Sequence, residues 1–190
     1  IPGTDGHRRE AAWLDSMLRA RADTLIVQQW THVTARGDTL ALTNFIARFR
    51  PAAARRILYL AHWDTRPYSD GPGSKDPKAP VPGANDGASG VAVLLGVADA
   101  LKRAPADVGV DLLFVDGEDF ADFYKEPNDV LIGSRYYAAH QVDGAKPDYA
   151  VLFDMVGDQD LRIPREPNSV IAAPDVMDMI WSIAKRTGHG

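Results

Sequence analysis

Three apolar runs that each end in residues suited to binding a metal constrain the fold of this chain most strongly. The runs cover residues 57–60, 108–115 and 149–153, and they lead to His62, to Glu118 with Asp119, and to Asp154. Between them, residues 86–103 and 130–140 have the pattern of helices. Strands that alternate with helices predict an α/β protein, a three-layer α/β/α sandwich, in which ligands gather beyond the carboxyl ends of the strands.

The segments that flank this core predict a hairpin, a long loop and two terminal helices. Residues 24–34 and 39–49 are rich in β-branched and aromatic residues and are joined by a turn with Gly37, which predicts a β-hairpin. The hairpin makes the expected sheet mixed, with a parallel centre and buried strands. Residues 66–83 contain five prolines and three glycines and predict an irregular loop. Residues 7–21 and 174–187 predict helices. We expect a single domain over residues 1–190.

Composition excludes several classes of function. A net charge of -5 without a long basic run argues against a nucleic-acid partner, and no apolar stretch approaches the length of a transmembrane helix. The first ten residues lack the pattern of a signal peptide, so we expect a cytosolic protein or one whose leader has been removed. Cysteine is absent, which excludes disulfides and thiol catalysis. Any metal must therefore be bound by histidine and carboxylates.

His62 and Asp64 form the first candidate pair. In an extended segment, residues two apart point the same way, so Asp64 is placed to accept a hydrogen bond from the ring nitrogen of His62 that faces away from a metal. A His–Asp pair that only stabilises a loop explains this segment equally well.

Asp86 is the second candidate, and it lies in the glycine-rich segment 83–90. An aspartate before a helix often serves as its N-cap. Capping does not explain so much glycine, whereas a close approach of the backbone to a site does. We therefore favour a metal ligand at Asp86.

Glu118 and Asp119 are adjacent acids, which is costly unless a cation neutralises one of them. With a metal bound, one acid can ligate while the other moves protons. A solvated turn is the alternative, and it suits Asp116 better than the pair. Asp154 is either a further ligand or a buried, hydrogen-bonded carboxylate. His32, His140 and His189 have simpler explanations as a strand residue, a helix-end residue and a tail residue.

Four segments together resemble the zinc exopeptidase superfamily, and within it the animal-type glutaminyl cyclases and their bacterial relatives. They are HWDTRP at 62–67, GANDGASG at 83–90, DGED at 116–119 and LFDMVG at 152–157, and the similarity extends over essentially the whole chain. The resemblance implies that Asp86 is the central zinc ligand, Asp119 the second ligand, and Glu118 the general acid/base. His62 and Asp154 occupy positions that bind a second metal in aminopeptidases, and the Asp154 position helps to orient substrate in cyclases.

The resemblance implies a zinc-dependent glutaminyl-peptide cyclotransferase, which converts the N-terminal glutamine of peptides to pyroglutamate and releases ammonia. One zinc is expected for a cyclase. A two-zinc aminopeptidase is the first alternative, and a non-catalytic binding relative is the second. Peptide N-termini are the implied partners, and a periplasmic or secreted location is implied.

The chain corresponds to about the first two-thirds of the family domain, so we expect the domain to be incomplete at its C-terminus. The family's remaining zinc-binding histidine lies beyond that point, and His189 is a poor substitute for it. The sequence does not indicate the oligomeric state.

Overall fold

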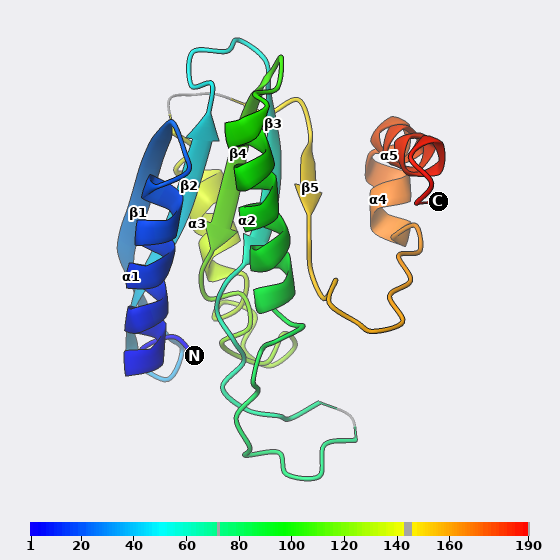
Figure 1. The fold of residues 1–190 in the computed structure, drawn as a ribbon. Coiled ribbons are helices and arrows are strands. Elements are labelled where there is room, and N and C mark those ends of the chain that lie inside the picture. The colour runs from blue at the N-terminus through cyan, green and yellow to red at the C-terminus, as the bar shows by residue number, and fades with distance from the viewer. Residues whose placement is uncertain (72, 143–145, 190) are drawn as a thin grey trace. The chain divides into compact units, whose positions relative to one another are not determined.

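The computed structural model describes residues 1–71, 73–142 and 146–189, and it divides the chain into two compact units, residues 1–158 and 159–190. Among the described residues, the first unit contains a five-stranded sheet and three helices. Figure 1 shows how they are arranged. The elements of the first unit are α1 (Asp5–Arg19), β1 (Thr24–Val33), β2 (Thr39–Phe49), β3 (Arg56–His62), α2 (Ala88–Arg103), β4 (Gly109–Val115), α3 (Ile132–Ala139) and β5 (Ala150–Leu152). The second unit contains α4 (Pro167–Ala172) and α5 (Pro174–Arg186).

The sheet is mixed, as the sequence predicted, and its strand order is β1-β2-β4-β3-β5. The hairpin strands β1 and β2 are antiparallel, and β2 is antiparallel to β4. By contrast, β3 runs parallel to both of its neighbours, β4 and β5. Because β3, β4 and β5 run in the same direction, the loops that follow them emerge at the same edge of the sheet.

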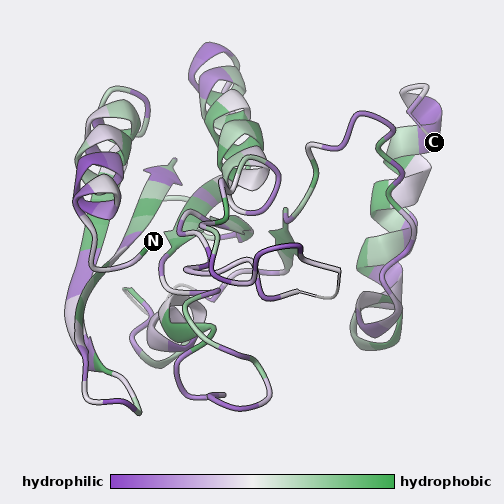
Figure 2. Ribbon diagram, turned by 90° about the horizontal axis from the view of Figure 1, so that it is seen from below, coloured by the Kyte–Doolittle hydropathy of each residue, from purple (hydrophilic) through white to green (hydrophobic). Residues whose placement is uncertain are grey.

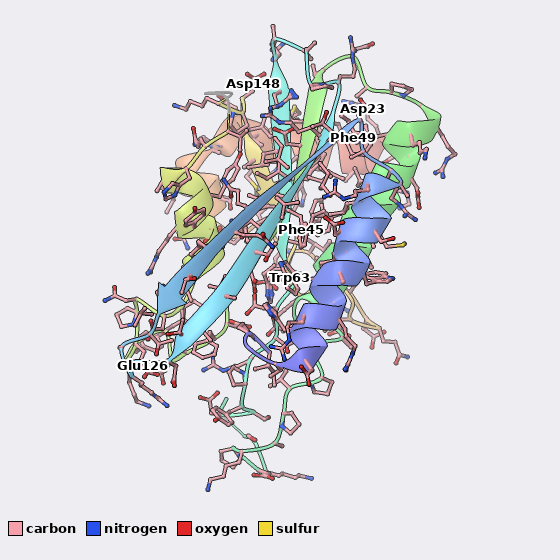
Figure 3. All side chains as sticks on the ribbon, turned by 90° about the vertical axis from the view of Figure 1, so that its left-hand side faces the viewer. Asp23, Phe45, Phe49, Trp63, Glu126 and Asp148 are labelled. Carbon is pink, nitrogen blue, oxygen red and sulfur yellow. The ribbon has the colours of Figure 1, made fainter. Side chains whose placement is uncertain are left out.

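Helices cover both faces of the sheet, which confirms the three-layer sandwich. On one face, Leu14 and Leu18 of α1 and Leu94 of α2 pack with Phe45 and Phe114 of the sheet in the larger core cluster. Figures 2 and 3 show α1 and α2 on this side and α3 on the opposite side. Removing such apolar surface from water stabilises the unit by about 25 cal/mol per Å² buried.

The opposite face has a smaller core beneath α3. Ile46, Leu58 and Leu113 are buried there, and Tyr137 of α3 packs against them. The alternation of side chains along β2 and β4 therefore supplies both cores, as the period of a strand requires.

Local chemistry explains where the predicted elements begin. Helix α1 begins at Asp5, two residues earlier than predicted, because Thr4 accepts a hydrogen bond from the backbone N–H of His7 as its N-cap. The hairpin prediction is confirmed, and Gly37 in its turn has a φ of 88°.

One expectation about the sheet is wrong. Residues 149–153 were expected to form a buried strand, but β5 has three residues and Leu152 is 51% exposed. The reason is its position, because β5 is the last strand of the described sheet and pairs only with β3.

The second unit is a pair of short helices. Proline stands in the first turn of both, and Glu166 caps α4 by accepting from the N–H groups of Asn168 and Ser169. Within the same unit, Arg165 pairs with Asp178 and lies over the ring of Trp181. That the two units form one domain stays a prediction. In the part of the chain that the structure describes, no helix has the length and apolar character needed to cross a membrane.

Candidate metal centre

Four chain segments meet around His62, which belongs to the first of them. His62 is the last residue of β3 and is buried. Its Nε2 atom lies 2.9 Å from Oδ1 of Asp86, which precedes α2, and 3.5 Å from Oδ1 of Asp154, which follows β5. The fourth segment, the turn after β4, brings Glu118 and Asp119 to the same place. The structure therefore brings together the five residues that the sequence singled out.

Two overlapping groups of these residues have ligand atoms within 4.8 Å of one another. One group is His62, Asp86 and Asp119, and the other is His62, Glu118 and Asp154. Imidazole nitrogen and carboxylate oxygen are the donors that zinc accepts in sites without cysteine. Asp86 and Asp119 thus lie close enough to share one ion, although their role as ligands stays a prediction.

The electrostatics of the cluster favour a cation. Burial, together with nearby carboxylates, raises the pKa of Glu118 to about 7, and burial beside Asp86 raises the pKa of Asp119 to about 6. The hydrogen bond with His62 lowers the pKa of Asp86. Burial alone would lower the pKa of His62, but three surrounding carboxylates outweigh it and raise the pKa. Negative charge is therefore concentrated where a metal ion would relieve it.

Asp64 supports the turn after β4, a role the sequence did not suggest. Its Oδ1 accepts from the backbone N–H of Glu118 at 2.9 Å, and its Oδ2 accepts from that of Asp119 at 3.3 Å. The predicted hydrogen bond from His62 is wrong in this structure, because Nδ1 lies 3.5 Å from Oδ1 and makes no hydrogen bond. The Asp64 carboxylate is directed at the turn's amides instead, which holds the two acids beside His62.

Gly87 lets the segment with Asp86 approach the strand that carries His62. Its φ is 89°, and a Cβ at this position would lie 2.7 Å from the carbonyl oxygen of Asp64. Helix α2 begins at Ala88 with Gly87 as its N-cap, so the interpretation of Asp86 as the capping residue is wrong. Gly87 thus shows the close backbone approach expected of these glycines, and that the approach serves a metal site stays a prediction.

The loop that carries Asp154 is fixed by hydrogen bonds to residues beside Asp86. Ser89 Oγ accepts from the N–H of Val156, and Asn85 Oδ1 accepts from the N–H of Gly157. Both supporting residues flank Asp86, so the two acidic segments are joined directly. The side chain of Asp154 is 37% exposed, which excludes the alternative of a buried carboxylate.

Asp116 differs from its expected place in a solvated turn. It is fully buried, and Nε2 of His7 lies 2.9 and 3.0 Å from its two carboxylate oxygens. The sequence analysis missed His7 because a single histidine in an amphipathic helix carries no spacing signal. His32 and His140 lie away from the cluster. His32 of β1 contacts Asp129, and His140 is the C-cap of α3.

A cavity of about 460 Å³ lies beside the turn that carries the acids. Phe120, which directly follows Asp119, lines it together with Arg66 and Tyr68. Arg66 is fixed there by two hydrogen bonds to the carboxylate of Asp70. The cavity adjoins the cluster through the turn, but none of the five cluster residues lines it.

Comparisons with known proteins find one matching family and several similar chains. The model of a family described as "Peptidase family M28" matches residues 44–188. A glutaminyl-peptide cyclotransferase-like protein of Bos taurus is 30% identical over 146 residues, which is 72% of this chain. Among solved structures, the glutaminyl cyclase of Bacteroides thetaiotaomicron is 32% identical, with a TM-score of 0.94 over the whole chain. A Zn-dependent exopeptidase of Parabacteroides distasonis is also 32% identical, with a TM-score of 0.93 over the whole chain.

The relatives are longer than this chain. The chain spans 36% of the length of the Bos taurus protein, 68% of the cyclase structure and 67% of the exopeptidase structure. All four segments of the cluster, residues 62–64, 86, 116–119 and 154, fall inside the range matched by the family model.

Proposed function

The chain belongs to peptidase family M28, and from that premise we propose that its acidic cluster is the active site of a zinc-dependent glutaminyl-peptide cyclotransferase. The observation that carries the proposal is the convergence of Asp86, Asp119 and Glu118 around His62. The similarity to proteins described as glutaminyl cyclases supports the choice of reaction. The proposed substrate is a peptide with N-terminal glutamine, which enters the active site by that residue.

The cluster fits a zinc ion by its donor types and by its excess of negative charge. Asp86 and Asp119 are the proposed ligands of the first ion, and His62 and Asp154 are the proposed ligands of a second ion, if one is bound. When bound, zinc supplies a Lewis acid that polarises the side-chain amide carbonyl of the substrate. Asp154, which is partly exposed, has the proposed role of orienting the substrate's α-amine.

Glu118 has the proposed role of proton carrier. In the reaction the α-amine nitrogen forms a bond to the side-chain amide carbon, the bond from that carbon to its nitrogen breaks, and ammonia leaves. Glu118 accepts the proton that the amine loses and gives it to the leaving nitrogen. In the metal-free protein, burial raises the pKa of Glu118 to about 7, which favours a carboxyl that can accept and return a proton near neutral pH.

A second candidate function is a two-zinc aminopeptidase. It is favoured by the two overlapping groups of ligands around His62 and by the similarity to a Zn-dependent exopeptidase. In that reaction Glu118 would take a proton from the attacking water and pass it to the leaving amine. The same residues would act, but the products would differ.

The test offers the purified protein a peptide with N-terminal glutamine and a leucine anilide side by side. Ammonia release supports the cyclase, and release of leucine would replace it with the peptidase. Metal analysis of the same sample adds a second criterion, with one zinc expected for a cyclase and two for a peptidase. Absence of zinc and of both products would leave a non-catalytic binding protein.

Glu118→Gln tests the proton carrier. We expect loss of ammonia release with zinc retained, because the amide keeps the shape of the side chain but cannot carry the proton. Glu166→Gln is the matched control, since Glu166 caps α4 in the second unit. Turnover that survives in Glu118→Gln would remove Glu118 from this role.

A further inference from the structure

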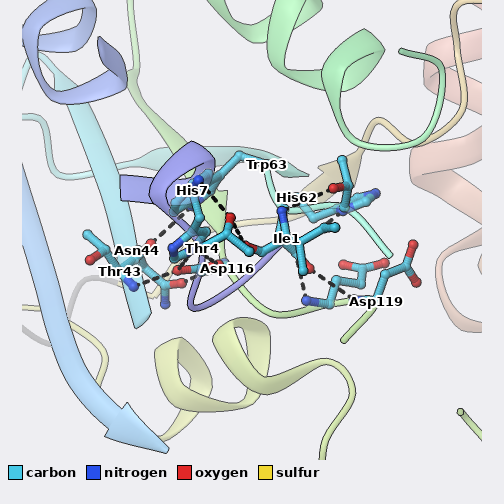
Figure 4. A network of polar contacts seen from close by, with 12 residues as sticks. Ile1, Thr4, His7, Thr43, Asn44, His62, Trp63, Asp116 and Asp119 are labelled. Carbon is cyan, nitrogen blue, oxygen red and sulfur yellow. Dashed lines mark hydrogen bonds and ion pairs between the residues drawn. The ribbon is translucent and has the colours of Figure 1, made fainter. Parts of the chain in front are cut away.

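His7 connects the first helix to the ends of β3 and β4, two of the strands that lead to the acidic cluster. It lies in the first turn of α1 and is 5% exposed. Its ring stacks on Trp63 with centroids 4.4 Å apart and an interplanar angle of 11°. Trp63 stands between His62 and Asp64 in the chain. His7 therefore contacts the segment that supplies the imidazole of the cluster (Figure 4).

The other side of His7 faces Asp116, the residue that follows β4. Because carboxylate oxygens only accept, Nε2 donates to Asp116, and it is shared between the two oxygens at 2.9 and 3.0 Å. Asp116 also accepts from the N–H of Thr43 at 2.8 Å, and its own N–H donates to Asn44 Oδ1 at 3.1 Å. Asn44 in turn donates to the carbonyl of Gly133. Asp116 is thus a fixed point shared by β2, β4 and α3.

The chain from this fixed point leads directly to the acids. Only Gly117, with a φ of 67°, separates Asp116 from Glu118. The far end of the same turn is held by Asp64, which accepts from the N–H groups of Glu118 and Asp119. The turn is therefore held at both ends. His7 contacts Asp116 at one end and, at the other, Trp63, which is the chain neighbour of Asp64.

We propose that His7, acting with Asp116, is a positioning residue that sets the distance between the Glu118–Asp119 turn and His62. It touches no ligand atom of the cluster. It acts by fixing Asp116 and the Trp63 ring, so that the two neighbouring strand ends cannot move independently. The inference rests on the proposed function, because it assumes that the cluster binds zinc. It adds a residue from outside the four segments that carry the family resemblance.

His7→Phe is the decisive variant, since phenylalanine keeps an aromatic ring against Trp63 but cannot donate to Asp116. The chain offers a matched control in His32→Phe. His32 Nε2 lies 2.8 Å from the buried Asp129, so this variant also removes a His–Asp contact without touching the turn after β4. His7→Gln restores a side-chain N–H donor and serves as the conservative variant.

Two measurements are made on each variant well below its unfolding temperature. Zinc affinity is measured by competition with a chromogenic chelator. Amide hydrogen exchange at Glu118 and Asp119 is measured by NMR on the metal-free protein. We expect His7→Phe to weaken zinc binding roughly tenfold, the lower end of the range for groups that support metal ligands. Exchange at the two amides should accelerate by a similar factor, His32→Phe should change neither, and His7→Gln should recover part of both.

The outcomes separate positioning from simple anchoring of α1. If His7→Phe lowers stability as His32→Phe does but leaves zinc affinity and the two exchange rates unchanged, His7 only anchors the helix and the inference is overturned. If the wild-type protein binds no zinc, the proposed function fails, and the exchange rates in the metal-free protein still decide the role of His7. Should His7→Phe not fold, Asp116→Asn replaces it, with several-fold faster exchange at the same two amides expected.

Discussion

The substitution Gly90→Ala, which adds one methyl group, tests how closely α2 packs against the segment that carries Asp154. Gly90 lies in the first turn of α2 and is buried. A Cβ there would lie 2.3 Å from the carbonyl oxygen of Phe153 and 2.8 Å from Cβ of Ala61. Neither neighbour moves freely, because the N–H of Phe153 donates to Leu60 of β3 and Ala61 belongs to that same strand. Gly90→Ala must therefore push α2 away from the sheet or displace the backbone before Asp154.

The magnitude follows from two opposing terms. Alanine is favoured over glycine within a helix by about 1 kcal/mol. Forcing a methyl group into a packed site typically costs about 1–3 kcal/mol, and a contact with backbone atoms belongs at the upper end. We therefore expect Gly90→Ala to lower the free energy of unfolding by about 2 kcal/mol, after the gain in helix propensity is subtracted.

Gly96→Ala is the matched control on the same helix. Gly96 is exposed, and a Cβ there would meet no atom within 4 Å. Only the propensity gain applies, so this variant should stabilise the protein by about 1 kcal/mol. Urea unfolding followed by tryptophan fluorescence measures both variants, and Trp13, Trp30 and Trp63 report on the first unit. Equal stabilisation by the two substitutions would refute the close packing described for Gly90.

Two further predictions concern the acids themselves. In the metal-free protein, Glu118→Gln should stabilise the protein relative to the wild type, and by about 2–3 kcal/mol more at about pH 8 than at about pH 5. Burial raises the pKa of the Glu118 carboxyl from 4.5 to about 7 on folding, so the wild type loses stability as pH increases through that window. Asp122→Asn is its control in urea unfolding: hydrogen bonds lower that pKa to about 2, so its contribution is complete above about pH 5, and a pH-dependent effect there would contradict the argument. Asp86→Ala should lower the zinc content of the purified protein, measured by atomic emission, whereas His140→Ala should not. Equal zinc in the Asp86 variant and the wild type would remove Asp86 from the ligand set.

Much of the fold follows from local pattern, and the elements that depend on neighbours were harder to predict. Strand β3 (Arg56–His62) contains the apolar run at residues 57–60 and ends at His62, as the sequence predicted, because a short apolar run between turn signals favours a buried strand. The strand predicted at residues 149–153 is present as β5, but the prediction that it is buried is wrong. The sequence shows that a segment is apolar, and only the sheet order shows that β5 has a neighbour on one side.

The acids of the cluster were recognisable because each follows a strand or precedes a helix, and parallel strands bring such positions to one edge. His62, Asp86, Glu118, Asp119 and Asp154 therefore meet as the sequence predicted. What surrounds them was not recognisable in the same way. His7 lies 109 residues from Asp116 in the chain, and no periodicity connects a helix residue with a strand end at that distance.

The amino-acid sequence by itself determined the type of fold, the acidic edge and the donor types available to a metal, because these depend on local periodicity and on residue chemistry. Only the tertiary structure decided that Asp64 holds the amides of the turn, that Asp116 is buried against His7, and that Asp86 is free of capping. Those features depend on which polar groups are left without a partner once the strands are assembled. Because buried polar groups are almost always hydrogen-bonded, their partners are set by what the fold brings near them.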